Sequence, residues 1–504
     1  MARVRGSPRS AARHTGRQYG SGAQYVFDDP FTLDFGPWRG CSDGLLRGSY
    51  KEYLGETEDA VIRNGKLCFA LIDSNATYTK DDDILGIFNF FVNNALHGIV
   101  IYEDATTGFI KVETYDGTTT TITLSSQASS GGRVHAVPWG DKIHIVQEDS
   151  SFGSNVLEYD VSAETFSTNS FPGTDPAEMI FFLDNNLVIL TDGATDAVYI
   201  RFAVDSNPDD FTSIGSGDNP VAAQLGEPMG HGLASDSEII MFEYGAVRMR
   251  PTGTLPAFQY DILEDFGGCP QQNAVVSDGN KVYFLDRSGY VRVTRGADPQ
   301  LIGSQPSALD VEETTTLHYS GEAGFVYATQ SAVQYTIDPV STEIVGYTTS
   351  PIVQELMTKL RSNLTGGNLI ATVDVGDKIW TKLLYTDGSV PTPAVAGTNV
   401  YTPYVDVGQE VEILYVDVFQ TDPAEPKVLS VVLEDFRQGI THVVVGEKVE
   451  DHGIFRRYYL HAFSPLFRLK LVLEQEIYFE DRGVTKMVLV TKAVGETAKG
   501  LMYG

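Results

Sequence analysis

The fold of this chain is decided by a short repeated pattern, which is clearest at Gly279-Asn280-Lys281-Val282-Tyr283-Phe284-Leu285. There a polar turn precedes an apolar run. Asn, Asp and Gly tolerate the positive φ angles that tight hairpins require, and a short run of Val, Ile, Phe and Tyr is typical of a strand buried on both faces. The stretch therefore predicts a hairpin that leads into a core strand.

The same pattern recurs along the middle of the chain. Its other copies are GDKIHIV at Gly140–Val146, DNNLVIL at Asp184–Leu190, DSEIIMF at Asp236–Phe242 and, more loosely, EAGFVYA at Glu322–Ala328. The first strand residues of the five copies, at positions 143, 187, 239, 282 and 325, are 44, 52, 43 and 43 residues apart. An earlier candidate, Asn64-Gly65-Lys66-Leu67-Cys68-Phe69, lies 76 residues upstream, so a repeat there would need an insertion.

Each copy continues into a second hairpin, and two of these, Tyr159–Phe166 and Tyr335–Ile344, resemble each other. A unit of about 43 residues with four strands cannot bury both faces of its sheet alone, whereas a ring of such units can; about 40 to 50 residues per unit is the propeller period. We therefore expect an all-β chain whose residues 61–355 form a five- or six-bladed β-propeller. A pair of β-sandwiches with coincidental spacing is the alternative.

The remainder of the chain lacks the repeated pattern. Residues 356–504 show no such period; Phe467–Glu474 alternates apolar and mostly polar residues, as in a half-exposed strand. We expect a separate, β-sandwich-like platform domain there. The segment 24–60 is expected to add strands to the platform, because chain ends often lie close together. Residues 1–23 are expected to form a flexible basic arm.

Charge is distributed unevenly. The chain has 504 residues, of which 42% are apolar, so it can bury large cores, and its formal charge is −31. The arm contains only basic charges, Arg3, Arg5, Arg9, Arg13 and Arg17. The acidity belongs to the middle of the chain, where it either keeps the protein soluble or faces a polyanion that must not adhere. The arm is either a disordered tail or a docking segment for an acidic neighbour, such as a second copy of this chain.

Motifs for catalysis, cofactors or metals are not found in the sequence. Gly230-His231-Gly232 lacks the serine of a hydrolase elbow, so His231 is expected to be a structural turn residue. For Asp81-Asp82-Asp83 we favour a solvated loop over a calcium site, since the alternating ligand loop is missing. The pair Glu264 and Asp265 could serve a glycosidase, but among 67 acidic residues such pairs arise by chance. We therefore predict no catalytic residue, no cofactor and no metal.

The sequence also gives no sign of a cysteine-based site or of a membrane-spanning or secretory segment. Cys41, Cys68 and Cys269 match neither a zinc site nor a disulfide framework, and we expect buried thiols. No apolar run reaches the ~20 residues that span a bilayer, and the basic start of the chain is not followed by the apolar core of a secretory signal. We expect no membrane insertion.

One succession of segments is more specific than a general pattern of strands and turns. It comprises Glu227–Leu233, Ile239–Val247, Pro251–Thr254, Phe266–Pro270, Asn273–Val276 and Lys281–Gly289. This succession resembles the tail nozzle proteins of short-tailed bacteriophages, which are also called packaged-DNA stabilisation or tubular tail proteins. The later segment Phe463–Leu471 is similar to the closing strands of that family.

The resemblance implies a structural virion protein without enzymatic activity. Members of the family are a propeller joined to a platform, assembled as a hexameric ring below the portal and its adaptor. The ring encloses the channel for double-stranded DNA, retains the packaged genome, guides its ejection and carries fibre, spike or needle proteins. The resemblance thus places the chain in the phage tail, after assembly in the host cytoplasm.

Two other functions stay open from the residues alone. One is a propeller glycosidase or polysaccharide depolymerase with carboxylates at its central tunnel, and the other is a monomeric propeller scaffold that binds proteins. For a nozzle, the acidity of the middle region suggests a channel wall that repels DNA, because an acidic surface gains nothing from counterion release.

Overall fold

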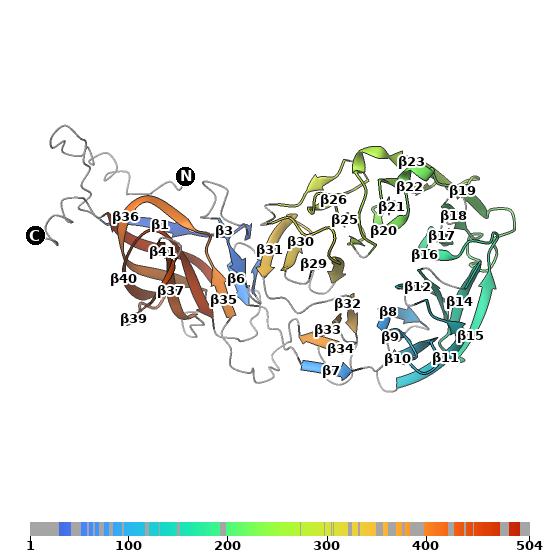
Figure 1. Ribbon diagram of the computed structural model, residues 1–504, viewed down its shortest axis with the longest axis horizontal. Coiled ribbons are helices and arrows are strands. Elements are labelled where there is room, and N and C mark those ends of the chain that lie inside the picture. Colours follow the sequence, from blue (N-terminus) through green and yellow to red (C-terminus); the bar gives the residue numbers. More distant parts are fainter. Residues whose placement is uncertain are drawn as a thin grey trace, which may run out of the picture.

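The computed structural model is all-β, with two short 3-10 helices, η1 (Ala223–Leu225) and η2 (Glu264–Phe266), among its described residues (Figure 1). The structure describes residues 30–41, 52–57, 60–63, 66–69, 75–79, 84–92, 95–115, 120–130, 132–148, 152–191, 198–272, 274–296, 298–303, 305, 307–320, 325–330, 333–348, 356–360, 369–374, 378–383, 398–421, 428–437, 440–446, 448–473 and 483–493. Within these ranges there is no helix of the length and apolarity needed to cross a bilayer.

Seven antiparallel sheets of four strands form the larger domain. The first four blades consist of β8 (Ile84–Val92), β9 (Ala95–Glu103), β10 (Phe109–Tyr115) and β11 (Thr120–Ala128); β12 (Val134–Trp139), β13 (Lys142–Gln147), β14 (Asn155–Asp160) and β15 (Thr165–Ser170); β16 (Ala177–Leu183), β17 (Asn186–Thr191), β18 (Tyr199–Phe202) and β19 (Gly217–Pro220); and β20 (Pro228–Ala234), β21 (Ser237–Phe242), β22 (Gly245–Pro251) and β23 (Phe258–Leu263). The last three consist of β24 (Val275–Ser277), β25 (Val282–Leu285), β26 (Val291–Thr294) and β27 (Gln300–Leu301); β28 (Thr316–Ser320), β29 (Phe325–Gln330), β30 (Val333–Asp338) and β31 (Glu343–Thr348); and β32 (Leu356–Leu360), β33 (Leu369–Asp374), β34 (Lys378–Leu383) and β7 (Asn75–Thr79).

These sheets close into a ring. The innermost strands β8, β12, β16, β20, β24, β28 and β32 contact one another in this order, and β32 returns to β8 (Figure 1). The protein is therefore a β-propeller, as predicted. It has seven blades, however, so the expectation of five or six blades is wrong.

The seventh blade explains part of the miscount. Its outermost strand is β7, which pairs with β34 in the register Ile379↔Tyr78 and precedes the first blade in the chain. One blade is thus assembled from two distant segments, and no complete copy of the repeat exists there in the sequence. The predicted domain boundary at 355/356 is wrong for the same reason, because strands β32 to β34 belong to the propeller.

The five copies of the turn and strand pattern are confirmed as second strands of blades two to six, namely β13, β17, β21, β25 and β29. The predicted second hairpins also recur. In the turn after β14 the Asp160 Oδ1 atom accepts the amides of Ser162 and Ala163, and Asp338 plays the same part after β30. The earlier candidate at residues 64–69 is instead part of a platform hairpin, β5 (Ala60–Arg63) with β6 (Lys66–Phe69). A polar turn specifies a hairpin in either domain.

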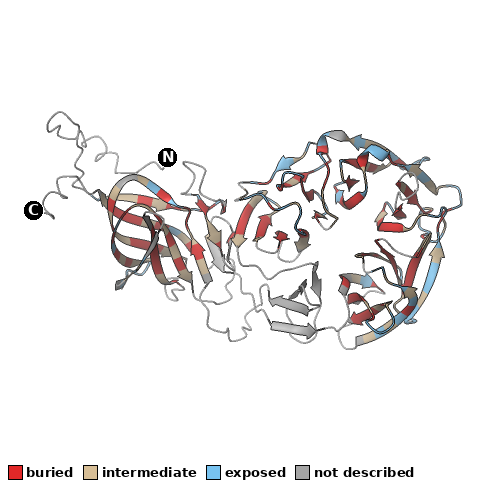
Figure 2. Ribbon diagram, in the orientation of Figure 1, coloured by how far each residue is buried: buried red, intermediate tan, exposed pale blue. Residues whose placement is uncertain are grey.

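Burial follows the double-sided packing of the blades. Every residue of β17, β21 and β29 is buried, because each second strand lies between two neighbouring sheets (Figure 2). The outer strand β15 is mostly exposed. Burying a Val, Leu, Ile or Phe side chain contributes roughly 1.5 to 3 kcal/mol, so these middle strands supply most of the stabilisation of a blade.

The smaller domain, the platform, is a single curled sheet rather than two separate ones. Its eleven strands are β1 (Phe31–Phe35), β4 (Glu56–Thr57), β5, β6, β35 (Thr398–Tyr401), β36 (Val405–Gln420), β37 (Val428–Arg437), β38 (Ile440–Val445), β39 (Lys448–Asp451), β40 (Phe455–Leu473) and β41 (Val484–Ala493). The two halves of β40 pair with different partners, β36 and β39 first and then β37 and β35, and β36 is interrupted by bulges. The long strands therefore bend over one core, which gives the sandwich-like packing that the sequence predicted.

Two strands of the segment before residue 60 belong to the platform, since β1 pairs with β41 and β4 with β35. A further two-stranded sheet, β2 (Gly40–Cys41) with β3 (Tyr53–Leu54), lies at the junction of the two domains. There the sixth blade's outer strand β31 contacts β2, β4 and β5. The Thr57 Oγ1 atom accepts a hydrogen bond from the Tyr347 amide at 2.8 Å, and Arg39 lies 3.8 Å from Glu343.

Gly289 tests how tightly the fifth blade packs against the segment that links it to the sixth. Its φ is +81°, and a Cβ atom there would lie 2.2 Å from the carbonyl oxygen of Leu309. We expect Gly289→Ala to lower the free energy of unfolding by roughly 3 kcal/mol or more, measured by chemical denaturation. The control is Gly279→Ala, where φ is +88° but no atom lies within 4 Å; it should cost only about 1 kcal/mol. Equal losses in the two variants would contradict this account.

Candidate functional site

The centre of the propeller is crossed by an arginine at one end. Arg133 directly precedes the inner strand β12 of the second blade, and its Nη1 atom donates to the carbonyl oxygen of Gln272 at 3.5 Å. Gln272 lies just before the inner strand of the fifth blade, on the far side of the ring. One end of the central axis is therefore spanned by a side chain that links the second blade to the fifth.

Three histidines occupy inner strands near this arginine: His135 on β12, His231 on β20 and His318 on β28. The His135 Nε2 atom lies 2.8 Å from Glu148 Oε1, and the His231 Nδ1 atom lies 2.7 Å from Glu238 Oε1. The Nε2 atom of His318 is buried and has no hydrogen-bond partner in the described structure.

Burial disfavours the charged form of two of these histidines, His135 and His318. It lowers the pKa of His135, although the hydrogen bond to Glu148 opposes the shift. It also lowers the pKa of His318 to about 3, and the positive charge of Arg133 adds to this effect. His318 is therefore uncharged at neutral pH, which limits the repulsion that Arg133 meets at the centre.

His231 lies within strand β20 and not in a turn, so that expectation is wrong. The glycines on either side of it have a packing role. A Cβ atom on Gly230 would lie 2.6 Å from the Val275 side chain, and one on Gly232 would lie 2.8 Å from Ser277. The Gly-His-Gly motif thus allows the inner strand of the fourth blade to pack directly against that of the fifth.

The remaining candidates do not gather at the centre. Asp265 is exposed on η2, which follows the outermost strand of the fourth blade. Burial raises the pKa of both Cys41 and Cys269 to about 12, so the prediction of buried thiols is confirmed for these two. The side chains of Cys68 and Glu264, the run Asp81-Asp82-Asp83 and all five arginines of the arm lie outside the described residues.

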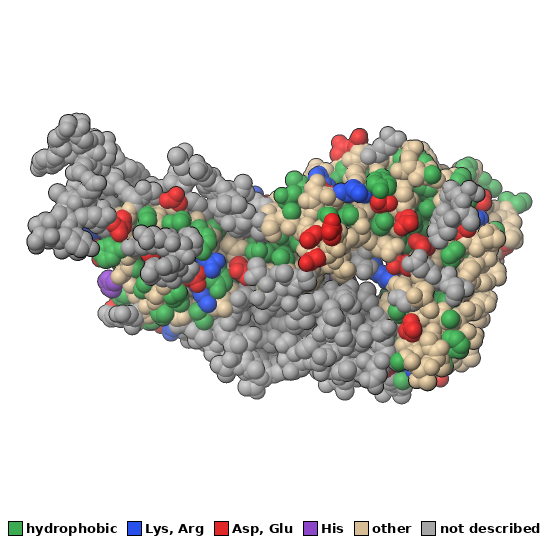
Figure 3. Space-filling view, viewed as in Figure 1, with side chains coloured by type: hydrophobic (Ala, Val, Ile, Leu, Met, Phe, Trp, Pro, Cys, Tyr) green, Lys and Arg blue, Asp and Glu red, His purple; other side chains and the backbone are tan. Residues whose placement is uncertain are grey.

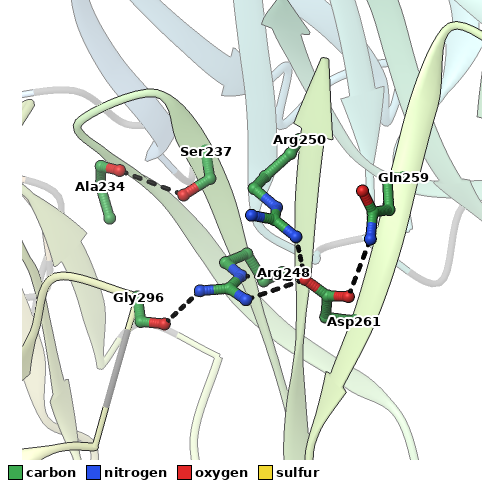
Figure 4. Close-up of polar contacts among 7 residues, drawn as sticks. All are labelled: Ala234, Ser237, Arg248, Arg250, Gln259, Asp261 and Gly296. Carbon is green, nitrogen blue, oxygen red and sulfur yellow. Dashed lines mark hydrogen bonds and ion pairs between the residues drawn. The ribbon is translucent and has the colours of Figure 1, made fainter. Parts of the chain in front are cut away.

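A basic strip joins the fourth and fifth blades. Arg248 and Arg250 both bind Asp261 Oδ2, at 2.8 and 2.7 Å, and Arg248 also donates to the carbonyl oxygen of Gly296 at 2.8 Å (Figure 4). The hydrogen bond from Arg248 lowers the pKa of Asp261, and Arg250 adds to it. The two arginines share one carboxylate, so the group keeps a positive charge on a domain that is otherwise acidic. The face of the propeller seen in Figure 3 carries more acidic than basic side chains.

Comparisons with known proteins found neither a matching family model nor a matching curated protein. Solved structures match weakly. They include BBS1N in complex with ARL6DN (TM-score 0.45, 10% identity, 64% of this chain and 99% of that chain), the mitotic checkpoint complex (TM-score 0.41, 11%, 62% and 97%) and the computationally designed Ika8 protein (TM-score 0.37, 10%, 62% and 100%). Similarity at this level says nothing about function.

Because His318 is buried and neutral, we expect the folding stability of the protein to fall in acid. The pKa of His318 is about 3 in the folded chain and about 6.5 in an unfolded one, so the unfolded state binds more protons below pH 6.5. The stability that depends on neutral His318 is therefore complete above pH 6.5 and is lost as the pH falls, by about 2 kcal/mol at pH 5. Calorimetry should show that His318→Gln loses less of its melting temperature between pH 7 and pH 5 than the wild type, by a few degrees.

The exposed His452 supplies the control, since His452→Gln removes an imidazole from the platform surface. That variant should follow the wild type at both pH values. An identical acid response of the wild type and His318→Gln would show that His318 is not held in its neutral form.

Proposed function

We propose that this protein is a structural virion protein, the tail nozzle of a short-tailed bacteriophage. In this role six copies form a ring below the portal and its adaptor, surround the DNA exit channel, retain the packaged genome and carry fibre, spike or needle proteins. The observation that carries the proposal is the architecture, a propeller joined to a platform, because this is the arrangement that the resemblance to the nozzle family implies.

The residues of that resemblance specify how two blades meet. Gly268 has a φ of +75°, and a Cβ atom there would lie 2.1 Å from the carbonyl oxygen of Glu243; its neighbour Cys269 is fully buried. In the following blade Asp286 Oδ1 accepts the amides of Ser288 and Tyr290. Substitution at these positions would disturb blade packing rather than chemistry. The resemblance therefore concerns the construction of the scaffold, as expected for a structural protein.

The hydrogen bond of Arg133 across the axis bears on where a channel could lie. We place the DNA conduit between copies and not along the axis of one propeller, so each copy needs a surface for the next. The platform offers a candidate. Strand β38 is at the end of its sheet, and Val443 and Val445 on it are 58% and 52% exposed. An apolar edge strand is a ready template for pairing with another chain.

The acidic charge fits a wall that DNA slides past. Asp141, Asp184 and Asp236 are exposed at equivalent turns, each following the inner strand of its blade. Inner strands of a propeller run in the same direction, so these carboxylates line one end of the domain, opposite Arg133. An acidic surface repels phosphates over a Debye length of about 8 Å.

Electron microscopy of the phage that encodes this chain tests the proposal. We expect a ring of six copies below the portal, and particles assembled without the protein should lose their DNA. The absence of the protein from purified virions would overturn the proposal. So would a monomer that releases sugar from bacterial surface polysaccharide, which is the outcome expected of a depolymerase.

The edge strand supplies a sharper prediction. Charged side chains at an apolar contact between copies are costly to desolvate, so Val443→Asp combined with Val445→Asp should abolish incorporation into rings, with a fall of at least tenfold in virion-associated protein. The control is Val340→Asp, at a propeller turn where the side chain is 90% exposed. Circular dichroism should show that both variants are folded. Normal incorporation of the double variant would show that β38 does not take part in the contact between copies.

A further inference from the structure

An unusual cluster lies between the second and third blades. It consists of His144 on β13, Glu158 on β14 and Asp209 in the loop between β18 and β19, and one nitrogen or oxygen atom from each lies within 4.8 Å of the others. His144 and Glu158 are direct cross-strand partners, so the sheet itself fixes their separation. Asp209 comes from the next blade and is half-exposed, with 49% of its side chain accessible.

His144 has no partner in this cluster. Its side chain is fully buried, and neither ring nitrogen makes a hydrogen bond; the Oε1 atom of Glu158 also has none. The His144 Nδ1 atom lies 3.6 Å from Glu158 Oε1, which is too long for a hydrogen bond. Polar atoms buried in this way cost free energy unless a ligand satisfies them.

The distance of 3.6 Å between His144 Nδ1 and Glu158 Oε1 is close to the distance between two ligand atoms of one metal ion. Two ligands with bonds of about 2.1 Å in tetrahedral geometry lie about 3.4 Å apart, close to the distance between the nitrogen and the oxygen. A neutral imidazole offers a nitrogen lone pair to a metal ion, and both ring nitrogens of His144 lack a hydrogen-bond partner in the described structure.

The surroundings hold Glu158 in place for this role. Its Oε2 atom accepts hydrogen bonds from Lys142 Nζ at 2.7 Å and Ser167 Oγ at 3.0 Å, which leaves Oε1 to face the imidazole. Asp209 Oδ1 accepts a hydrogen bond from Asn169 at 3.3 Å, and Asp209 Oδ2 lies 3.9 Å from Lys142. Partners of this kind orient the ligands of a metal site from outside it.

We propose that His144, Glu158 and Asp209 bind a divalent transition-metal ion of the zinc class, which links the second blade to the third. One imidazole with two carboxylates suits Zn²⁺, whereas Ca²⁺ takes six to eight oxygen ligands at longer distances. The exposure of Asp209 provides a path for the ion and leaves room for a water ligand. The ion would satisfy the buried imidazole and neutralise two carboxylates that face each other. This proposal is independent of the role in the virion.

The test uses the full chain, stripped with a chelator and then titrated with Zn²⁺ at pH 7.5 by calorimetry, with Co²⁺ as an optical probe. We expect one ion per chain, a dissociation constant in the micromolar range or tighter, and absorption bands of bound Co²⁺. Saturating Zn²⁺ should raise the melting temperature, since a ligand that binds only the folded state stabilises it.

Variants decide whether these residues are the ligands. Asp209→Asn and Glu158→Gln should each weaken Zn²⁺ binding at least tenfold; Asp209 lies in an exposed loop, so its variant should stay folded. The control is Asp205→Asn, an exposed aspartate of the same loop, which should bind as the wild type does. Unchanged affinity in both ligand variants would overturn the proposal. Binding only after Lys142→Met would also overturn it, because the lysine would then be the native cation.

Discussion

The structure depends on the pairing of strand β7 with β34. Every blade buries both faces of its sheet against neighbours, so no blade is stable alone and the ring has to close. The chain runs through the blades in order from the first to the seventh. Strand β7 comes before β8 of the first blade in the chain but pairs with β34 of the seventh, so backbone hydrogen bonds between β7 and β34 close the ring. This closure also explains why the platform is built from both ends of the described chain. The chain leaves the platform after β6 and returns to it at β35, so the propeller is inserted into the platform.

Much of the fold could be predicted from local signals, and its errors have physical causes. Turn residues such as Asp184 and Asn185, with φ of +50° and +63°, specify a hairpin by themselves, so the second strands of blades two to six are visible in the sequence. A polar residue at position 97 and the unequal spacing concealed the place of β8 and β9 in the repeat. The seventh blade was hidden because its hydrogen bonds join segments about 300 residues apart.

The candidate sites were less predictable, since they combine side chains from different blades. Arg133 and Gln272 meet across the axis only because the ring has a particular number of blades. The pair His144 and Glu158 could have been found once the hairpin register was known, as they stand opposite each other on adjacent strands. Asp209 could not, because its position depends on how the third blade packs against the second. The spacing of residues in the sequence is enough to locate strands. A site formed between two blades can be found only when the packing of those blades is known.

The two ends of the propeller axis differ in charge, and this asymmetry limits what the domain can do. At one end Arg133 crosses the centre near His318, which burial keeps neutral, so this end of the axis carries a positive charge. At the other end Asp141, Asp184 and Asp236 stand in solvent, where they cost little and repel anions. In the proposed nozzle the acidic end would be the one suited to face DNA, while the strip of Arg248 and Arg250 between the fourth and fifth blades carries a positive charge.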